Sequence, residues 1–148
     1  MRKGIGIGIV IAVVGLILIV GIDFFPDQDE YSELKNMSIE ELQELSVSWY
    51  YDDLLRNPEK YKGKIIEFDG KIFRVDSLGK DHYALIVWVG DDLDQLVVEW
   101  KGGRLLDGDK IRGYGVFEKV VDLGSMLADN YYNPKPWVEG IQITCIRC

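Results

Sequence analysis

The fold class is decided by the stretch KIIEFDGKIFRVD at residues 64–76. Apolar residues recur at every second position, so Ile66, Phe68 and Ile72 share one face of a predicted strand. Gly70 stands in the middle of this strand, where a glycine favours a bend or a bulge. Because a long bent strand can belong to both halves of a small barrel, we predict that role for residues 64–76.

Four further strand-like segments follow, each bounded by turn residues. They are Tyr83–Val89, Gln95–Trp100, Lys110–Val120 and Trp137–Ile146. An isolated five-stranded sheet would leave exposed edges, and closure into a barrel removes them. The sequence therefore predicts a mainly β fold with some α structure, built around a five-stranded OB-fold barrel.

A helix is predicted ahead of the barrel. Ser38 is placed to cap its N-terminus, and Glu41 completes a capping box three residues later. The apolar residues that follow form two stripes, so we expect one amphipathic helix that lies against a sheet. The helix should end at Asn57, because the residue before a proline is pushed out of the α region.

The N-terminal segment Gly4–Ile22 is uncharged over nineteen residues. As a helix it would be about 28 Å long, close to the ~30 Å hydrocarbon core of a bilayer. Arg2 and Lys3 precede it and acidic residues follow, which predicts a single-pass membrane protein with a cytoplasmic N-terminus. A cleaved signal peptide is the alternative, but the run is long and no small-x-small cleavage site closes it. The predicted division is an anchor at 1–22, an acidic stalk at 23–37, and a helix-plus-barrel domain at 38–148.

The acidic charge is concentrated next to the predicted anchor. Residues 23–53 hold ten acids and one base, whereas the rest of the chain from residue 54 holds fifteen acids and fourteen bases. A nucleic-acid-binding domain is expected to carry a clear excess of positive charge. Nucleic acid is therefore an unfavoured partner for this barrel.

The chain has two cysteines, Cys145 and Cys148, and one histidine, His82. Residues three apart in an extended strand point to opposite faces and lie too far apart to bridge, so a disulfide requires a terminal turn. A single C-x-x-C with one remote histidine is a weak metal or redox signal, and we expect His82 to be an exposed polar residue. No cofactor, metal site or catalytic residue is predicted. Asn36 begins a glycosylation sequon whose occupancy stays open.

Two segments resemble a known family. Residues 51–64, YDDLLRNPEKYKGK, continue into Phe68–Ile72, and residues 105–115 read LLDGDKIRGYG. Both are similar to the tRNA_anti-like OB-fold proteins, in which a helix leads through an N-P-x-x-Y-x-G-K turn into the first barrel strand. The resemblance covers residues 50–146 and implies an anchored or secreted OB barrel. It implies little about activity.

A second resemblance is to the haem chaperone of cytochrome c maturation, which also combines one anchor with one external barrel. Val97–Gly102 and Asp129–Pro134 are similar to its segments. That family attaches haem through a histidine, or a cysteine in some variants, just before a tyrosine. This chain has Leu127, Ala128 and Asp129 there, so the haem role lacks its attaching residue.

OB barrels bind ligands mainly on strands two and three, beside the loops. Four aromatic residues are our candidate ligand-binding side chains: Tyr83, Trp88, Trp100 and Tyr114. For the two tryptophans the alternative is a place in the barrel core. One basic cluster is the other candidate, and its alternative is a set of solvated side chains around a turn: Arg56, Lys60, Lys62 and Lys64.

From these features we expect a membrane-tethered, extracytoplasmic interaction module without catalytic activity, which binds a protein partner and serves as an accessory subunit of a membrane complex. Gly4–Ile22 would be its contact with the membrane. The first alternative is a binder of single-stranded nucleic acid or of an oligosaccharide outside the cell. The second is a cofactor carrier similar to the haem chaperone.

Overall fold

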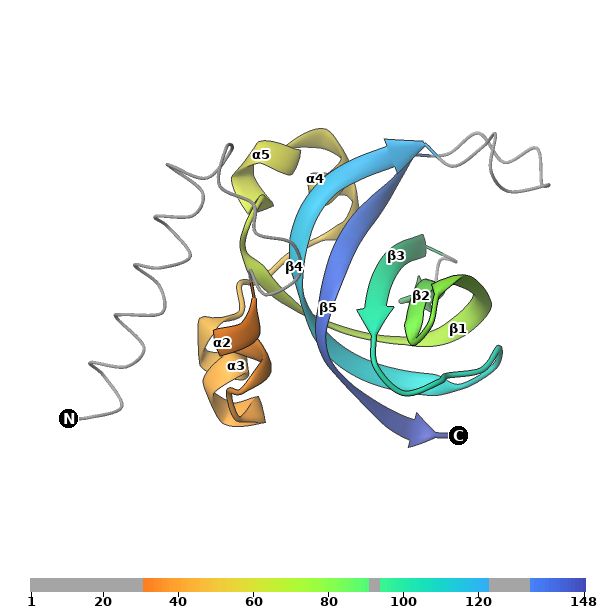
Figure 1. Ribbon diagram of the computed structural model, residues 1–148. Helices are drawn as coiled ribbons and strands as arrows, with labels where there is room; N and C mark the ends of the chain where they lie inside the picture. Colours follow the sequence, from red (N-terminus) through yellow and green to blue (C-terminus); the bar gives the residue numbers. More distant parts are fainter. Residues whose placement is uncertain (1–30, 91–93, 123–133) are drawn as a thin grey trace. The chain divides into compact units, whose positions relative to one another are not determined.

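The computed structural model describes residues 31–90, 94–122 and 134–148 (Figure 1). The chain divides into two compact units, Met1–Ser46 and Val47–Cys148.

Two short helices make up the described part of the first unit: α2 (Ser32–Lys35) and α3 (Ile39–Leu45). The Ser38 side chain accepts a hydrogen bond from the backbone N–H of Glu41 at 3.2 Å, so the predicted N-cap is confirmed. However, α3 ends at Leu45, and Ser46 is extended. The prediction of one continuous amphipathic helix up to residue 57 is therefore wrong.

The reason lies in the backbone between α3 and α4 (Tyr51–Arg56). The N–H of Val47 donates to the carbonyl oxygen of Ile65 at 2.9 Å, and the Trp49 Nε1–H donates to that of Glu67 at 2.8 Å. These bonds tie the segment to the first barrel strand, and tertiary hydrogen bonds of this kind replace the helical ones. Both predicted apolar stripes are thus interrupted, because Val47 and Trp49 lie in the segment between α3 and α4.

Asn57 ends α4, as predicted, and the next residue begins α5 (Pro58–Tyr61). Asn57 has φ −129° and ψ 57°, outside the helical region. Pro58 is at the first position of α5, where its missing N–H costs nothing and its fixed φ suits a helix. One proline thus ends one helix and starts another.

Five strands form a closed barrel in the order β1-β2-β3-β5-β4, so the predicted five-stranded barrel is confirmed. All neighbouring strands are antiparallel except β3 and β5, which are parallel. The strands are β1 (Ile65–Gly79), β2 (His82–Val89), β3 (Asp94–Lys101), β4 (Lys110–Asp122) and β5 (Pro134–Arg147).

Gly70 is the residue at which β1 passes from one neighbour to the other. It pairs with Ile111 of β4 and also with Val89 of β2, and β1 continues along β2 beyond it. A Cβ at this position would overlap the carbonyl oxygen of Trp88. The predicted sharing of the strand between two halves of the barrel is confirmed, because only glycine allows β2 to approach so closely. The irregularity in register comes slightly later, between Ile72 and Arg74.

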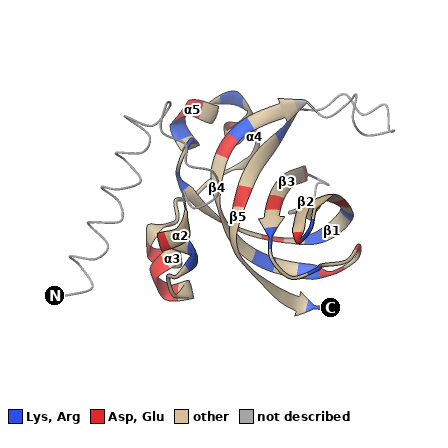
Figure 2. Ribbon diagram, viewed as in Figure 1, with Lys and Arg blue, Asp and Glu red and all other residues tan. Residues whose placement is uncertain are grey.

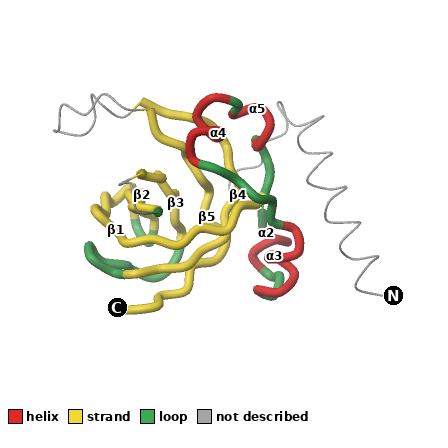
Figure 3. Tube along the Cα trace, turned by 180° about the vertical axis from the view of Figure 1, so that it is seen from behind, coloured by secondary structure: helices red, strands yellow, loops and turns green. Residues whose placement is uncertain are grey.

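The core fills the barrel interior and continues into one of its ends. Leu54 of α4 and Tyr61 of α5 join the same buried cluster as the inward-facing strand residues Phe68, Leu85 and Val98. Tyr51 of α4 fixes the helices further, since its hydroxyl donates to the carbonyl oxygen of Gln95, at the start of β3, at 2.8 Å. Figure 3 shows α4 and α5 together beside the strands. We call this the capped end.

The predicted fold class needs one further correction, which concerns the membrane helix. The described ranges contain four short helices, and none is long and apolar enough to cross a bilayer. Each has four to seven residues, which at about 1.5 Å per residue is far short of a ~30 Å hydrocarbon core. The segment predicted to be the anchor, Gly4–Ile22, lies outside the described residues.

Candidate functional site

The end of the barrel opposite the helices is hollow. A cavity of about 580 Å³ is lined by the end of β1, the start of β2 and the loop between β3 and β4. We call this cavity the mouth, and its residues are Val75, Ser77, Tyr83, Arg104, Leu105, Leu106 and Asp107. Cavities of this size are typical of ligand sites.

Backbone hydrogen bonds hold the loop at residues 102–109 against β1. The N–H of Ile72 donates to the carbonyl oxygen of Asp109 at 2.9 Å, and the N–H of Gly108 donates to that of Ile72 at 2.7 Å. A carboxylate oxygen of Asp107 accepts from the N–H of Val75 at 3.0 Å. Gly108 has a φ of +92°, which favours glycine at this turn. The wall of the mouth is therefore set by the chain's own hydrogen bonds and is formed before any ligand arrives.

Two of the four predicted aromatic residues lie at this end of the barrel. Tyr83 lines the mouth and pairs in register with Trp100 on β3. Both are half-buried and pack against the core cluster, on the inward-facing side of their strands. The Trp100 Nε1–H donates to the carbonyl oxygen of Gly103 at 3.0 Å, so this ring supports the base of the loop. Of these two rings, only Tyr83 lines the mouth, so it is the one that a ligand could contact.

One exposed cation stands at the rim of the mouth. Within the described ranges, the guanidinium of Arg104 makes no ion pair or hydrogen bond. Leu106, beside it in the loop, is 54% exposed. A cavity of mixed polar and apolar lining with an accessible guanidinium at its edge fits a ligand that has both an apolar group and an anionic one.

The other two predicted aromatic residues lie away from the mouth and outside the core cluster of the barrel interior. Trp88 stacks on Phe73 with ring centroids 4.8 Å apart. Tyr114 on β4 is only 4% exposed, and burial, followed by the nearby Glu67 carboxylate, raises the pKa of its hydroxyl. The structure thus divides the predicted aromatic set between two faces, because side chains alternate along each strand.

The predicted basic cluster surrounds the capped end and not the mouth. Lys60 of α5 makes an ion pair with Asp53 at 3.0 Å, and the Tyr61 hydroxyl donates to the same carboxylate. Hydrogen bonds from Tyr61, Asn57 and Lys60 lower the pKa of Asp53 to about 2. The remaining members, Arg56, Lys62 and Lys64, are exposed. Lys60 therefore takes part in a local network that holds α4 to α5.

A polar cluster that the sequence reasoning missed lies on the outside of the barrel. His82 is half-buried, and its Nε2 lies 2.7 Å from a carboxylate oxygen of Glu99. Carboxylate oxygens of Glu99, Glu118 and Glu139 lie within 4.8 Å of one another, and Figure 2 shows acidic positions on β3, β4 and β5. Single acids inside otherwise apolar strands are the sequence signal that points to this cluster.

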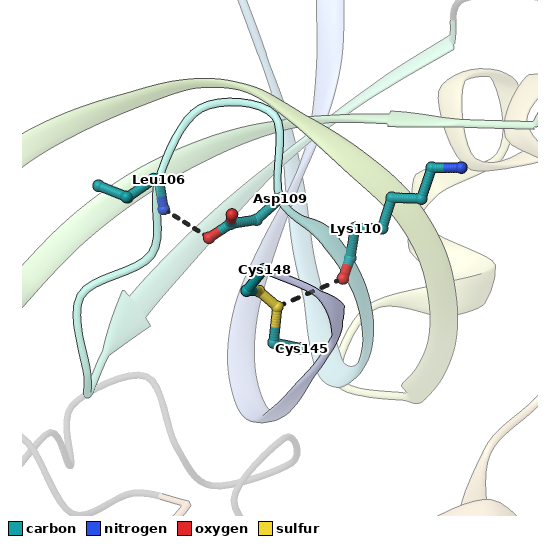
Figure 4. Close-up of a disulfide and its surroundings, with 5 residues drawn as sticks. All are labelled: Leu106, Asp109, Lys110, Cys145 and Cys148. Atoms are coloured by element: carbon teal, nitrogen blue, oxygen red, sulfur yellow. Dashed lines mark hydrogen bonds between the residues drawn. A yellow bond between two sulfur atoms is a disulfide. The ribbon is translucent and has the colours of Figure 1, made fainter.

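The two cysteines form a disulfide, with their Cα atoms 6.0 Å apart (Figure 4). Three fully extended residues would span about 10 Å, so the chain turns back at the end of β5. Of the alternatives open from sequence, the structure contains the local disulfide. The Cys145 sulfur lies 3.6 Å from the carbonyl oxygen of Lys110, directly after the loop at the mouth. Because a disulfide sulfur carries no proton to donate, this is a packing contact.

Neither a protein-family model nor a curated protein matches this chain. The function of the barrel is therefore inferred from the residues of the mouth and their surroundings. The similarity to the tRNA_anti-like proteins and to the haem chaperone stays a prediction.

Proposed function

We propose that this protein is a binding module without catalytic activity, and that its mouth takes an extended segment of a protein partner. An apolar side chain of the partner enters the cavity beside Tyr83 and Leu105, and an acidic side chain of the same segment pairs with Arg104. The observation that carries this proposal is that one preformed cavity combines apolar and aromatic side chains with the Arg104 guanidinium, which makes no ion pair or hydrogen bond within the described residues.

The chemistry of the lining supports binding over catalysis. Among the described residues, those that line the mouth include neither a histidine nor a cysteine, and the Asp107 carboxylate holds the loop to Val75. A nucleophile or a general base needs a partner within hydrogen-bond reach. The mouth combines a preformed cavity with the Tyr83 ring and the exposed Arg104 guanidinium, and these groups suit recognition of a ligand.

The strand order supports assignment of the barrel to the OB-fold class. In this arrangement β1 pairs with both β2 and β4, and β3 closes the barrel against β5. OB barrels use strands two and three and the adjoining loops for ligands, and the mouth lies next to the start of β2. The Cys145–Cys148 disulfide supports an extracytoplasmic location, because disulfides persist in oxidising compartments.

The arrangement of charge and aromatic groups favours a protein ligand over nucleic acid. A groove for single strands combines a positive track with successive stacking rings. Here the basic cluster surrounds the capped end, whereas the Trp88 ring is stacked on Phe73 and Tyr114 is buried, so neither lies beside the mouth. We expect single-stranded oligonucleotides to bind more weakly than about 10⁻⁵ M at physiological salt, at the weak side of non-specific affinities.

A peptide selection tests the proposal. A random peptide library is selected against the immobilised full chain, and the dissociation constants of the winning peptides are measured by fluorescence anisotropy. We expect peptides that combine large apolar residues with an acidic one. Arg104→Glu should weaken them at least tenfold, or about 1.4 kcal/mol, by placing like charges together.

The matched control is Arg56→Glu, the same reversal of an exposed arginine at the capped end. It should leave the affinity unchanged. Tyr83→Ala should also weaken binding, since it removes the aromatic wall. Selected peptides without acidic residues, or equal loss in both arginine variants, would show that the mouth is not the binding site.

A further inference from the structure

The barrel closes through its shortest strand pairing, which is also its parallel one. We call it the β3–β5 seam, and it consists of three pairs: Val97 with Trp137, Val98 with Val138, and Glu99 with Glu139. The last pair places two carboxyl groups side by side on the outer face of the barrel. Two acids in paired positions are unexpected at this short seam, because two ionised carboxylates on neighbouring strands repel each other and destabilise the sheet.

The two carboxyl groups of this pair lie close together. Glu99 and Glu139 occupy paired positions on β3 and β5, and a carboxylate oxygen of one lies within 4.8 Å of a carboxylate oxygen of the other. A side-chain hydrogen bond between them is among the causes that shift both pKa values. Two ionised carboxylates have only acceptor oxygens, so this hydrogen bond requires a proton on one of them. Glu139 is 7% exposed, which makes it the member that loses most by carrying a charge. The paired register, the short distance and the burial of Glu139 therefore favour a pair that holds one shared proton.

Charged and polar groups from each adjoining strand face the pair. His82 on β2 contacts Glu99 at 2.7 Å, and Glu118 on β4 has a carboxylate oxygen within 4.8 Å of both acids. Lys101 on β3 acts on Glu139 through its charge. The ring of Trp137 on β5 donates to Glu99, and the Lys119 ammonium of β4 lies over that ring at 5.8 Å.

The direction of the shifts agrees with this geometry. Burial, the hydrogen bond to Glu99 and the charges of Glu99 and Glu118 raise the pKa of Glu139 to about 8. Burial alone would raise the pKa of Glu99 as well, but hydrogen bonds from Glu139, His82 and Trp137 outweigh it and lower that pKa. The proton therefore resides on Glu139, and Glu99 is the carboxylate.

We propose that the Glu99–Glu139 pair makes closure of the β3–β5 seam depend on pH. While the shared proton is present, the hydrogen bond joins the two strands. In mildly alkaline solution Glu139 releases this proton to the solvent, which leaves two adjacent carboxylates. Their repulsion then loosens the seam, while the antiparallel pairings hold the rest of the barrel. The seam is separate from the mouth, so this proposal does not depend on the proposed function.

The sign follows from proton binding. Between the ordinary glutamate pKa near 4.5 and the folded value of about 8, the folded chain holds a proton that the unfolded chain has lost. Stability then falls as the pH rises through this interval, because the folded state binds more protons. Above about pH 8 the stabilising proton is gone.

Hydrogen exchange of the full chain between pH 6 and pH 9.5 tests the proposal. Amide exchange is followed by mass spectrometry and corrected for the intrinsic rise of exchange with pH. Peptides over 94–101 and 134–140 report on the seam, and peptides over 70–76 and 84–89 report on the β1–β2 pairing. We expect seam protection to fall at least tenfold relative to β1–β2 protection above pH 8.

Glu139→Gln should abolish this relative change, because the amide keeps the hydrogen bond to Glu99 and cannot ionise. Two further variants move the midpoint in opposite directions. Lys101→Ala should raise it, since the lysine charge favours ionised Glu139, and Glu118→Gln should lower it. Lys71→Ala, which removes an exposed lysine of β1, should leave it in place.

Parallel loss of protection at the seam and in β1–β2 would overturn the proposal. So would an unchanged transition in Glu139→Gln. If Glu139→Gln does not fold, the test is whether Lys101→Ala and Glu118→Gln move the midpoint of the pH-dependent change in opposite directions. Absence of both shifts would refute the proposal.

Discussion

The capped end and the mouth are closed in different ways. At the capped end, α4 and α5 insert Leu54 and Tyr61, which are 0% and 4% exposed, into the core. At the mouth, a loop attached by backbone hydrogen bonds leaves a cavity and a Leu106 side chain that is 54% exposed. Buried apolar side chains thus fill the capped end of the barrel, whereas the loop at the other end surrounds a cavity.

The capped end therefore contributes mainly to stability, whereas the mouth is available for ligand recognition. Buried apolar side chains contribute most of the free energy of folding, and their loss leaves a cavity. The loop at the mouth contributes little apolar burial, so its side chains are available to a ligand without a large loss of stability. Substitutions at the two ends should therefore affect different measurements.

The largest expected effect is on the capped end. Leu54→Ala should lower the free energy of unfolding by roughly 2–5 kcal/mol, because it removes a fully buried side chain from the core. Leu106→Ala, the same change at the mouth, should stay within about 0.5 kcal/mol of the parent. Urea unfolding of both variants measures the difference. Equal destabilisation would mean that the mouth is packed as tightly as the capped end.

An intermediate effect is expected for the two tyrosine hydroxyls. Tyr51→Phe removes the hydrogen bond that joins α4 to the carbonyl oxygen of Gln95 and should cost about 1 kcal/mol of unfolding free energy. Tyr83→Phe at the mouth should change stability by only a few tenths of that amount, because within the described ranges its hydroxyl makes no hydrogen bond. Thermal unfolding compares the stabilities of the two variants. A larger loss of stability in Tyr83→Phe than in Tyr51→Phe would contradict the proposed difference between the two ends.

The smallest effect concerns acid stability of the capped end. The lowered pKa of Asp53, about 2 against an ordinary 3.8, means that its ionised form stabilises the fold above about pH 4. This contribution is lost as the pH falls through 2. Asp53→Asn should therefore be slightly less stable than the parent at pH 6, and this deficit should shrink through pH 2 and vanish below it, as measured by urea unfolding. Asp52→Asn makes the same charge change at an exposed neighbour and is the control. A deficit that does not shrink as the pH falls below 2 would show that Asp53 acts through packing.

The strands and the capping residues could be predicted because their signals are local. Alternation along residues 64–76, the glycine at 70 and the Ser38 cap all act within a few residues of chain. The break after Leu45 could not, since it depends on hydrogen bonds from Val47 and Trp49 to the first barrel strand. Local periodicity cannot reveal a competing partner that is distant in sequence.

The candidate site was predicted only in part, for a related reason. Tyr83 and Trp100 were selected because they are aromatic, and register brings them together at the mouth. Trp88 and Tyr114 have the same chemistry but lie outside the core cluster and away from the mouth, which strand alternation and barrel closure decide together. Arg104 gave no signal of its own, because an isolated exposed arginine gains meaning only from the cavity beside it.

By itself, the sequence determined that residues 64–148 form a barrel of five strands and that the bend falls at Gly70, because side-chain period and backbone freedom are properties of short segments. Only the tertiary structure decided which end is sealed, where the mouth opens, and that Glu99 and Glu139 meet. These features depend on strand order and register, through which residues forty positions apart become neighbours. The Glu99–Glu139 pair exists only once the barrel has closed, because closure brings β3 beside β5 and two ordinary acids of the sequence into register.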